Sequence, residues 1–338
     1  MQKRLLLVIA AFSVSFTTWA QEDVDLFDLS LEELMNVEIV SASRKEESLF
    51  DAPVSSSVIT HEEIARSGVT TIPEALRLSP GLIVRETTNG NYEVFVRGFD
   101  NLHRYGSSTE QHNLYTLVMI DNRPVFNYNL GGTYWESLPI DLIDIERIEI
   151  VRGPSAPLFG PNAVTGVINI ITRHPKKEGM YPAGNVQYGS FDARIANVAL
   201  GMKVNDKLRF SLSGNHQQRD RSDDQYYVYD ADAFVETPNP GGTIIAETAY
   251  PDSELAVEKK ALNAFVEYRA TDNIRVELSA GVQDAATQRF SYASNMPLAF
   301  NYNDSRYVNL AGEFYGMGAK ISYNRGYEDL IPRFADRG

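Results

Sequence analysis

The stretch IERIEIVRGPSAPLFGPNAVTGVINIIT, residues 145–172, holds two strand-like apolar runs separated by a segment rich in glycine and proline. Short apolar runs bounded by such turn residues are typical of buried strands. The second run places Asn169 between isoleucines, and a buried amide needs a hydrogen-bonding partner. The sequence therefore predicts two strands of one compact unit and a polar partner for Asn169.

The glycines of this stretch do not have the spacing of a phosphate-binding loop. A Walker loop requires Gly-x-x-x-x-Gly followed by Lys and then Ser or Thr. Here Gly166 is followed by Val167, so the required lysine is missing. The five histidines show no His-Glu-x-x-His spacing, and we find no nucleophile elbow. We therefore expect no enzyme activity, no metal site and no cofactor.

Several glycines and charged residues of the first half stand together at predicted strand ends. The glycines suit sharp turns or close backbone approach, and plain turn chemistry also explains each one alone. The charged residues could lie on an ordinary solvent-exposed surface. Equally, if a barrel encloses the unit, they could face the polar lining of that barrel. These residues are Arg97, Gly98, Glu149, Arg152, Gly153, Gly160 and Gly166.

Residues 52–173 are predicted to form one compact α+β unit. Two Thr-x-x-Glu sequences, which start at Thr60 and Thr71, have the spacing of capping boxes at helix starts. The first helix is expected to end at Gly68, because glycine suits the left-handed residue that closes a helix. The expected strands are 54–59, 82–86, 92–97, 114–120, 145–151 and 167–172.

Two polar, aromatic loops of this unit, Phe99–Asn113 and Phe126–Leu138, are longer than a tight turn requires. Loops of that length are usually functional. Their arginine and aromatic side chains would suit an anionic or planar ligand, although each also fits a plain surface position. The candidate ligand-facing residues are His103, Arg104, His112, Tyr128, Tyr134 and Trp135.

The second half of the chain alternates apolar with polar residues in runs of about ten residues, the pattern of strands in an outer-membrane β-barrel. A secreted β-sandwich is the alternative, but its strands are usually nearer five or six residues. Short turns near 205–206, 271–273 and 316 alternate with longer connections at 218–258 and 284–305. The runs lie at 196–204, 208–213, 262–269, 274–283, 308–314 and 319–324.

The alternating pattern over residues 174–338 predicts about seven barrel strands. Closed bacterial barrels use even numbers from about 8 upward, and an open sheet would leave unpaired edges in lipid. The fold class predicted is thus an α+β unit followed by part of an antiparallel transmembrane β-barrel that this sequence does not complete. We interpret the sequence as the N-terminal part of a longer protein.

The first 20 residues have the pattern of an export signal. Lys3 and Arg4 precede a short apolar run, and small residues stand before the predicted cleavage site. A membrane anchor is the alternative, but a span needs about 20 apolar residues. The chain has no cysteine, which excludes a disulfide scaffold.

Residues 21–51 form an acidic arm, with 10 acidic and two basic side chains among residues 22–51. Such a composition is typical of a solvated, mobile segment and makes nucleic acid an improbable partner. Val37–Ser43 is β-prone without an obvious hairpin partner, so it is available to pair with another protein's sheet. The alternative is an edge strand of the following unit.

The order of these motifs resembles the plug domain of TonB-dependent outer-membrane receptors. The resemblance covers roughly residues 37–174, and the last two blocks are the most specific in combination. The residues that carry it are Val37–Ser43, Asp51–Thr60, Ile72–Arg77, Pro80-Gly81, Val96–Phe99, Leu117–Asp121, Ile145–Pro154 and Asn162–Thr172.

The resemblance implies a plug inside a 22-stranded barrel in the outer membrane of a Gram-negative bacterium. It implies that Val37, Glu38, Ile39, Val40, Ser41, Ala42 and Ser43 form a TonB box, which pairs by strand addition with periplasmic TonB. TonB would deliver energy for uptake of a scarce, large nutrient: a ferric siderophore, haem, cobalamin or a glycan. Asn169 would then face the polar lining of the barrel.

Two departures and two alternatives accompany this interpretation. Asn122 stands where the family commonly has glycine, which the turn tolerates because asparagine accepts positive φ. Pro161 replaces a residue that is usually small or polar. The alternative functions are a receptor that binds ligand without transport and a plug-containing fragment that transports nothing.

Overall fold

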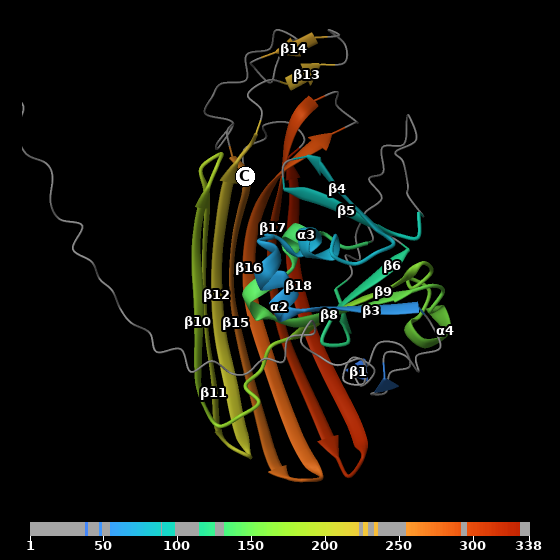
Figure 1. Cartoon of the computed structure of the whole chain (residues 1–338), viewed down its shortest axis with the longest axis vertical. Helices are drawn as coiled ribbons and strands as arrows, with labels where there is room; N and C mark the ends of the chain where they lie inside the picture. The colour runs from blue at the N-terminus through green and yellow to red at the C-terminus, as the bar shows by residue number, and fades with distance from the viewer. Residues whose placement is uncertain are drawn as a thin grey trace, which may run out of the picture.

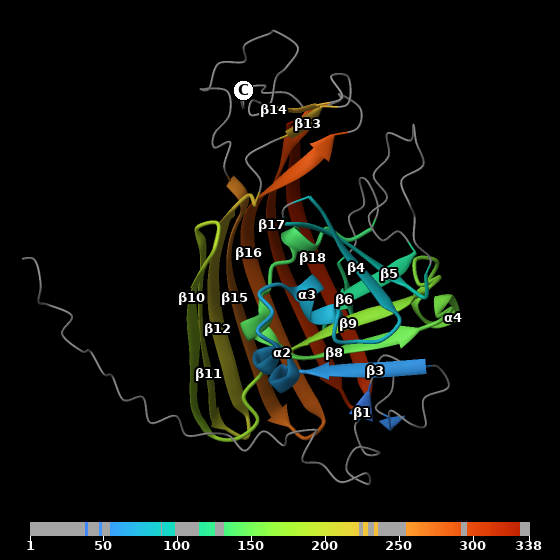
Figure 2. The ribbon, with the colours of Figure 1, turned by 45° about the horizontal axis from the view of Figure 1, so that its top comes forward.

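The computed structural model describes residues 38–39, 47–48, 55–88, 90–98, 115–125, 132–222, 226–228, 233–235, 255–291 and 296–331. These residues form two parts, a small α+β unit and a tall sheet of seven strands (Figure 1). The unit packs against one face of the sheet, and the turned view in Figure 2 shows the same arrangement. We call the first part the plug and the second the strand wall.

The plug is built on a five-stranded sheet in the order β3-β8-β9-β6-β7. β6 and β9 are parallel, whereas β8 runs antiparallel to both β3 and β9. The two central strands, β8 and β9, are the two apolar runs predicted from the sequence. The bounds are β3 (Ser55–Thr60), β6 (Thr116–Ile120), β7 (Arg123–Pro124), β8 (Ile145–Arg152) and β9 (Gly166–Thr172).

The first plug helix, α2 (His61–Ser67), begins and ends where the sequence predicts. The Thr60 hydroxyl accepts a hydrogen bond from the Glu63 N–H, and the Glu63 carboxylate accepts one from the Thr60 N–H. This reciprocal pair satisfies two backbone donors that the first helical turn leaves open. Gly68 closes the helix with a φ of 73°, which an L side chain rarely adopts.

The second helix, α3 (Ile72–Leu76), corrects part of the prediction. The Thr71 hydroxyl accepts from the Glu74 N–H as expected. The Glu74 carboxylate, however, accepts a hydrogen bond from Arg77 Nε at 3.0 Å, so the predicted reciprocal box is only half formed. A third helix, α4 (Ala156–Phe159), follows β8. Among the described residues, no helix is both long and apolar enough to cross a membrane.

The plug has its own apolar core between its sheet, the helices α2 and α3, and a hairpin. Ile148, Ile150, Ile168 and Ile170 alternate along β8 and β9 and are all fully buried. Each such side chain contributes about 1.5–3 kcal/mol relative to an exposed position. The other elements are the hairpin strands β4 (Leu82–Thr88) and β5 (Asn91–Val96) and the 3-10 turns η1 (Trp135–Ser137) and η2 (Leu142–Asp144).

The strand wall is a single antiparallel sheet in which each strand pairs with the next in sequence, in the order β10-β11-β12-β15-β16-β17-β18. This confirms the predicted count of seven strands, and the sheet is not closed into a barrel among the described residues. A small pair, β13 (Tyr226–Val228) with β14 (Ala233–Val235), lies beyond one end. The wall bounds are β10 (Gly179–Gly189), β11 (Ala193–Asn205), β12 (Leu208–Asp220), β15 (Leu255–Thr271), β16 (Ile274–Ser291), β17 (Met296–Phe314) and β18 (Met317–Ile331).

The wall strands are longer than the sequence pattern indicates. β16 and β17 have 18 and 19 residues, and their pairing continues as far as Ser291 opposite Met296. The predicted long connection over 284–305 is therefore wrong, since only residues 292–295 separate the two strands. A backbone ladder needs no particular side chains, so it continues beyond the stretch in which apolar and polar residues alternate.

The two faces of the wall differ in chemistry. Val198, Leu262 and Ile321 point away from the plug and are exposed. Asn197 and Gln283 point toward the plug and are buried. The alternation read from the sequence thus separates an apolar outer face from a polar inner face that the plug covers.

Only two residues of the predicted TonB box, Glu38 and Ile39, are described. They form the strand β1 (Glu38–Ile39), which pairs with β2 (Glu47–Ser48). The sequence shows no obvious hairpin partner for this segment. In the structure its partner is the two-residue strand β2. The rest of the predicted box lies outside the described residues.

Candidate functional site

The interface between the plug and the inner face of the strand wall gathers most of the polar chemistry described. We call it the plug–wall interface. Its two ends are the short-turn end, at the turns 206–207, 272–273 and 315–316, and the opposite, loop end. Both parts contribute side chains that hydrogen-bond across it.

The predicted ligand-facing residues are not brought together among the described residues. His103, Arg104, His112 and Tyr128 lie outside them. Tyr134 and Trp135 are described and are 3% and 2% exposed, so neither side chain is open to a ligand in this structure. This corrects the expectation for these two residues: Trp135 belongs to the plug core, because η1 turns inward and packs against β5.

The predicted motif residues act mainly within the plug. Arg152 donates to the carbonyl oxygens of Pro80 and Ser56 and to the Ser55 hydroxyl, and so ties β8 to β3 and to the turn before β4. The buried Glu149 carboxylate pairs with Arg147 at 2.8 Å. Arg152 and Glu149 therefore have their partners within the plug. The sequence had allowed either a solvent-exposed position or contact with a barrel lining.

The motif glycines mark positions where a side chain would not fit or would be strained. A Cβ on Gly166 would lie 2.3 Å from the Val151 carbonyl oxygen, because β8 and β9 approach closely there. Gly153 has a φ of 139° and lies beside the Arg97 guanidinium. Gly98 and Gly160 also have positive φ, as does Arg97 itself. The expectation of turns and close approach fits this geometry.

Asn169 finds its partner in the turn between β6 and β7. Its Oδ1 accepts from the Asn122 N–H and its Nδ2 donates to the Asn122 Oδ1, both at 3.1 Å. Asn122 has a φ of 60°, as its tolerance of positive φ predicts. The hydrogen-bonding partner of Asn169 is thus a plug residue. The prediction that Asn169 faces the barrel lining is not needed to satisfy its amide.

The same turn fastens the plug to β17 and β18. Arg123 donates to Asn324 Oδ1 at 2.8 Å, and its guanidinium lies 4.5 Å from the centre of the Tyr307 ring. Lys320 donates to the Asp121 carbonyl oxygen at 3.0 Å. Cations from both sides therefore cross the interface next to the Asn122–Asn169 pair.

The segment between plug and wall is held by His174. Its ring stacks on Phe265 of β15, with centroids 3.6 Å apart. Its Nε2 lies 3.0 Å from the Thr172 hydroxyl, which itself donates to Asp121 Oδ2. His174 Nδ1 is buried and has no hydrogen-bonding partner within the described structure. Nε2 therefore carries the proton of a neutral imidazole.

Burial lowers the pKa of His174 to about 4, since the protonated ring would lose its hydration. The Asp121 carboxylate opposes this shift, and the Arg209 guanidinium adds to it. His174 is thus neutral at physiological pH, which suits a ring that stacks between the two parts.

Toward the loop end, wall side chains reach plug carbonyl groups. Lys259 of β15 donates to the Ile140 oxygen at 2.8 Å, and Gln283 of β16 donates to the Glu136 oxygen at 3.2 Å. Nearer the loops, Arg219 pairs with Glu86 of β4 at 2.5 Å. Sequence reasoning missed these residues, because nothing in the alternation pattern shows which inward positions meet the plug.

A cavity of about 310 Å³ lies between these two groups of contacts. Its lining is polar on both sides and includes Arg123, Glu277 and Lys320. Asn263 Nδ2 and Asn309 Oδ1 are buried without a protein partner among the described residues. A polar space of this size has room for several water molecules.

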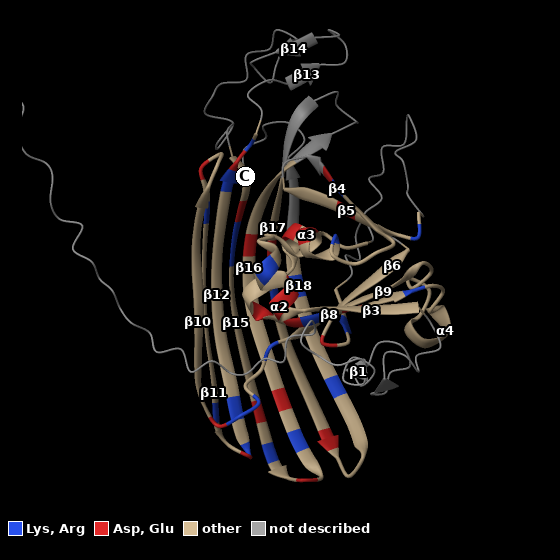
Figure 3. Ribbon diagram, in the orientation of Figure 1, with Lys and Arg blue, Asp and Glu red and all other residues tan. Residues whose placement is uncertain are grey.

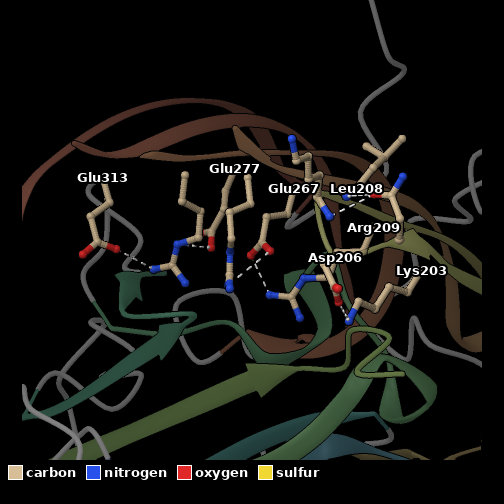
Figure 4. Close-up of polar contacts among 11 residues, drawn as sticks. Lys203, Asp206, Leu208, Arg209, Glu267, Glu277 and Glu313 are labelled. Atoms are coloured by element: carbon tan, nitrogen blue, oxygen red, sulfur yellow. Dashed lines mark hydrogen bonds and ion pairs between the residues drawn. The ribbon is translucent and has the colours of Figure 1, made fainter. Parts of the chain in front are cut away.

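A row of ion pairs crosses the inner face near the short-turn end (Figure 4). Glu267 of β15 accepts from Arg209 of β12 at 2.6 Å, and Arg275 of β16 lies 3.2 Å from Glu313 of β17. Figure 3 shows the corresponding blue and red bands at the short-turn ends of the wall strands. The row joins four neighbouring strands.

No group of three or more His, Asp or Glu side chains within the described residues could hold a metal ion. The interface instead offers hydrogen bonds and charges that both parts share. Such an arrangement can hold the plug in place on the inner face of the wall.

Comparison with known proteins agrees with this geometry. Residues 48–167 match the family model described as TonB-dependent Receptor Plug Domain. The chain is 35% identical over 149 residues to the vitamin B12 transporter BtuB of Photobacterium profundum, covering 43% of this chain and 22% of that protein. It is 27% identical over 312 residues to the iron-regulated outer membrane virulence protein of Vibrio cholerae serotype O1, covering 84% and 41%.

Among solved structures, the ferric yersiniabactin uptake receptor FyuA of Yersinia pestis has the same fold, with a TM-score of 0.60 at 18% identity. The match covers 86% of this chain and 42% of that one. The fold and interface thus define a class, a plug packed on the inner face of a barrel wall. Residues 48–167 are a TonB-dependent receptor plug domain, and the seven-stranded sheet resembles part of that family's barrel. The chain spans about two fifths of the Vibrio and Yersinia proteins.

Proposed function

We propose that this chain belongs to a TonB-dependent transporter that takes up a scarce, large nutrient across the outer membrane. The observation that carries the proposal is the plug domain packed against the polar inner face of a barrel-like wall. The exposed apolar outer face, with Val198 and Ile321, suits contact with lipid. The nutrient classes remain ferric siderophores, haem, cobalamin and glycans, and the relatives' names favour iron complexes and cobalamin.

Energy for uptake is proposed to come from TonB, through strand addition at Val37–Ser43. A short β-prone segment in an acidic arm suits this role, because it would lose only the small β1–β2 pairing when another strand takes it. The plug loops that contain His103, Arg104, His112 and Tyr128 are proposed to contact the nutrient.

Growth of a deletion strain, complemented with the intact gene, tests the proposal. Cells are supplied with single iron complexes or cobalamin, with and without TonB. We expect one nutrient to support growth only when both the gene and TonB are present. Growth that is independent of the gene on every nutrient would contradict the proposal.

Proline at position 39 tests the TonB box. Ile39→Pro removes a backbone donor and should abolish uptake while ligand binding to cells is kept. Leu26→Pro, in the same acidic arm but outside the box, is the matched control and should transport normally. Equal loss of uptake in both variants, or loss of binding in Ile39→Pro, would argue against the box assignment.

A further inference from the structure

Lys259 is a lysine of the strand wall whose side chain enters the plug. It is 6% exposed, and its Nζ donates to the Ile140 carbonyl oxygen at 2.8 Å. The carboxylates of Asp141, Asp144 and Glu136, all in the plug, lie near enough to attract its ammonium group. A buried ammonium is tolerated only when it is hydrogen-bonded and paired. Any movement of the plug along the wall must therefore break or replace this contact.

The next residue along β15, Lys260, is also a lysine but is not buried. Lys260 points to the opposite face, because successive residues of a strand alternate. Its side chain is exposed and pairs with Glu258. Of two adjacent lysines of β15, one therefore lies in the interface and the other lies outside it.

Lys259 also lies at a partition between two cavities. Ile140 lines the larger cavity of about 310 Å³, whereas Asp141 and Lys259 line a smaller one of about 40 Å³ toward the loop end. The bond from Lys259 to Ile140 crosses from one to the other. On the next strand, the bond from Gln283 to the Glu136 carbonyl oxygen continues this barrier.

The larger cavity itself has the chemistry of a passage for polar solutes. Its wall side carries amide, hydroxyl and charged groups, among them Asn263, Ser279, Glu277 and Lys320. Buried amide atoms without protein partners in the described structure, on Asn263 and Asn309, are free to hydrogen-bond a solute or water. The Lys259 bond joins a residue that lines this space to one that lines the smaller cavity.

We propose that Lys259 is a gate anchor, which closes the loop-end side of the larger cavity, and that the nutrient's passage opens along β12, β15 and β16 when this contact breaks. The proposal rests on the proposed uptake function. The passage would admit a polar, hydrogen-bonding solute in preference to an apolar one. Its opening would join the two cavities along the wall.

Cysteine accessibility tests this proposal. These 338 residues contain no cysteine, and any cysteine in the remainder of the full-length protein is first replaced by serine. Ala311→Cys places one thiol in the larger cavity, where Ala311 is part of the lining. A membrane-impermeant maleimide is added to intact cells that carry the full-length protein, lack TonB and receive no nutrient. We expect labelling to rise at least about tenfold when Lys259→Met is added, equivalent to about 1.4 kcal/mol.

Three variants make the test decisive. Lys260→Met, on the outer face, should leave the labelling rate unchanged, and Lys259→Arg should keep the thiol protected. If Lys259→Met fails to reach the membrane, Asp141→Asn, which removes the main counter-charge, should accelerate labelling instead. Unchanged labelling in Lys259→Met protein that has reached the membrane would overturn the proposal. If Asp141→Asn is used in its place, unchanged labelling in that variant would overturn it. The labelling test uses neither TonB nor nutrient. Its outcome is therefore independent of the growth experiment that tests the proposed uptake.

Discussion

The plug and the strand wall bury different kinds of surface. The plug buries isoleucines such as Ile150 and Ile168 in a core of its own. The inner face of the wall instead buries amides such as Asn197, Gln283 and Asn309 against the plug. Apolar burial stabilises the plug internally, whereas polar contacts join the plug to the wall. Polar contacts can be exchanged for water at a small net cost, so the plug can separate from the wall without exposing its core.

The largest test of this comparison removes core volume from the plug. Ile150→Ala leaves a cavity in a fully buried site and should lower the free energy of plug unfolding by about 2–5 kcal/mol. Fluorescence of Trp135, which is buried in the same core, reports the transition. Ile321→Ala on the outer face of β18 is the matched control and should leave this transition unchanged. A similar loss in both variants would contradict separate stabilisation.

A smaller effect is expected at the Asn122–Asn169 pair. On backbone conformation alone, Asn122→Gly should be neutral or stabilising, because φ is 60° there. It also removes the side-chain oxygen that accepts from Asn169 Nδ2, whereas the backbone N–H at position 122 still donates to Asn169 Oδ1. Loss of this acceptor for a buried amide should destabilise the plug by about 1–3 kcal/mol.

The double variant separates the two effects. In Asn122→Gly with Asn169→Leu, the buried amide that lost its acceptor is itself removed. The backbone N–H at position 122 belongs to an exposed residue and can bond water instead, so most of the stability should return. Denaturant unfolding followed by Trp135 fluorescence measures all three variants. A single Asn122→Gly variant that is as stable as the parent would show that the pair is unimportant.

The smallest effect is a pH dependence from His174. Its pKa is about 4 in the folded protein, below the unfolded value of about 6.5. The unfolded chain therefore binds the proton more readily, and stability is lost as pH falls from about 6.5 to about 4. Allowing for partial exposure, we expect a loss of about 1–2 kcal/mol.

His174→Gln should remove this loss. Burial raises the pKa values of Asp141 and Asp144, which act in the opposite sense, so the quantity to compare is the difference between parent and variant at each pH. Thermal unfolding of the detergent-solubilised protein between pH 7 and pH 4 provides it. A parent and variant that respond identically to acid would contradict a neutral, buried imidazole.

Local sequence signals predicted the plug well where the physics is local. The capping box at Thr60, the helix stop at Gly68 and the apolar runs of β8 and β9 each depend on a few neighbouring residues. The second box failed because Arg77 competes for the Glu74 carboxylate, a choice that the spacing alone does not reveal. The predicted loop over 284–305 failed because strand pairing extends beyond the alternating pattern.

The sequence by itself determined the strand periodicity, both ends of α2 and the motifs that mark a plug, since these follow from neighbours along the chain. The tertiary structure alone decided which polar residues meet. It placed Trp135 in the core, paired Asn169 with Asn122 and sent Lys259 into the plug while Lys260 stayed outside. Those pairings join residues up to 119 positions apart, and their partners depend on how plug and wall pack.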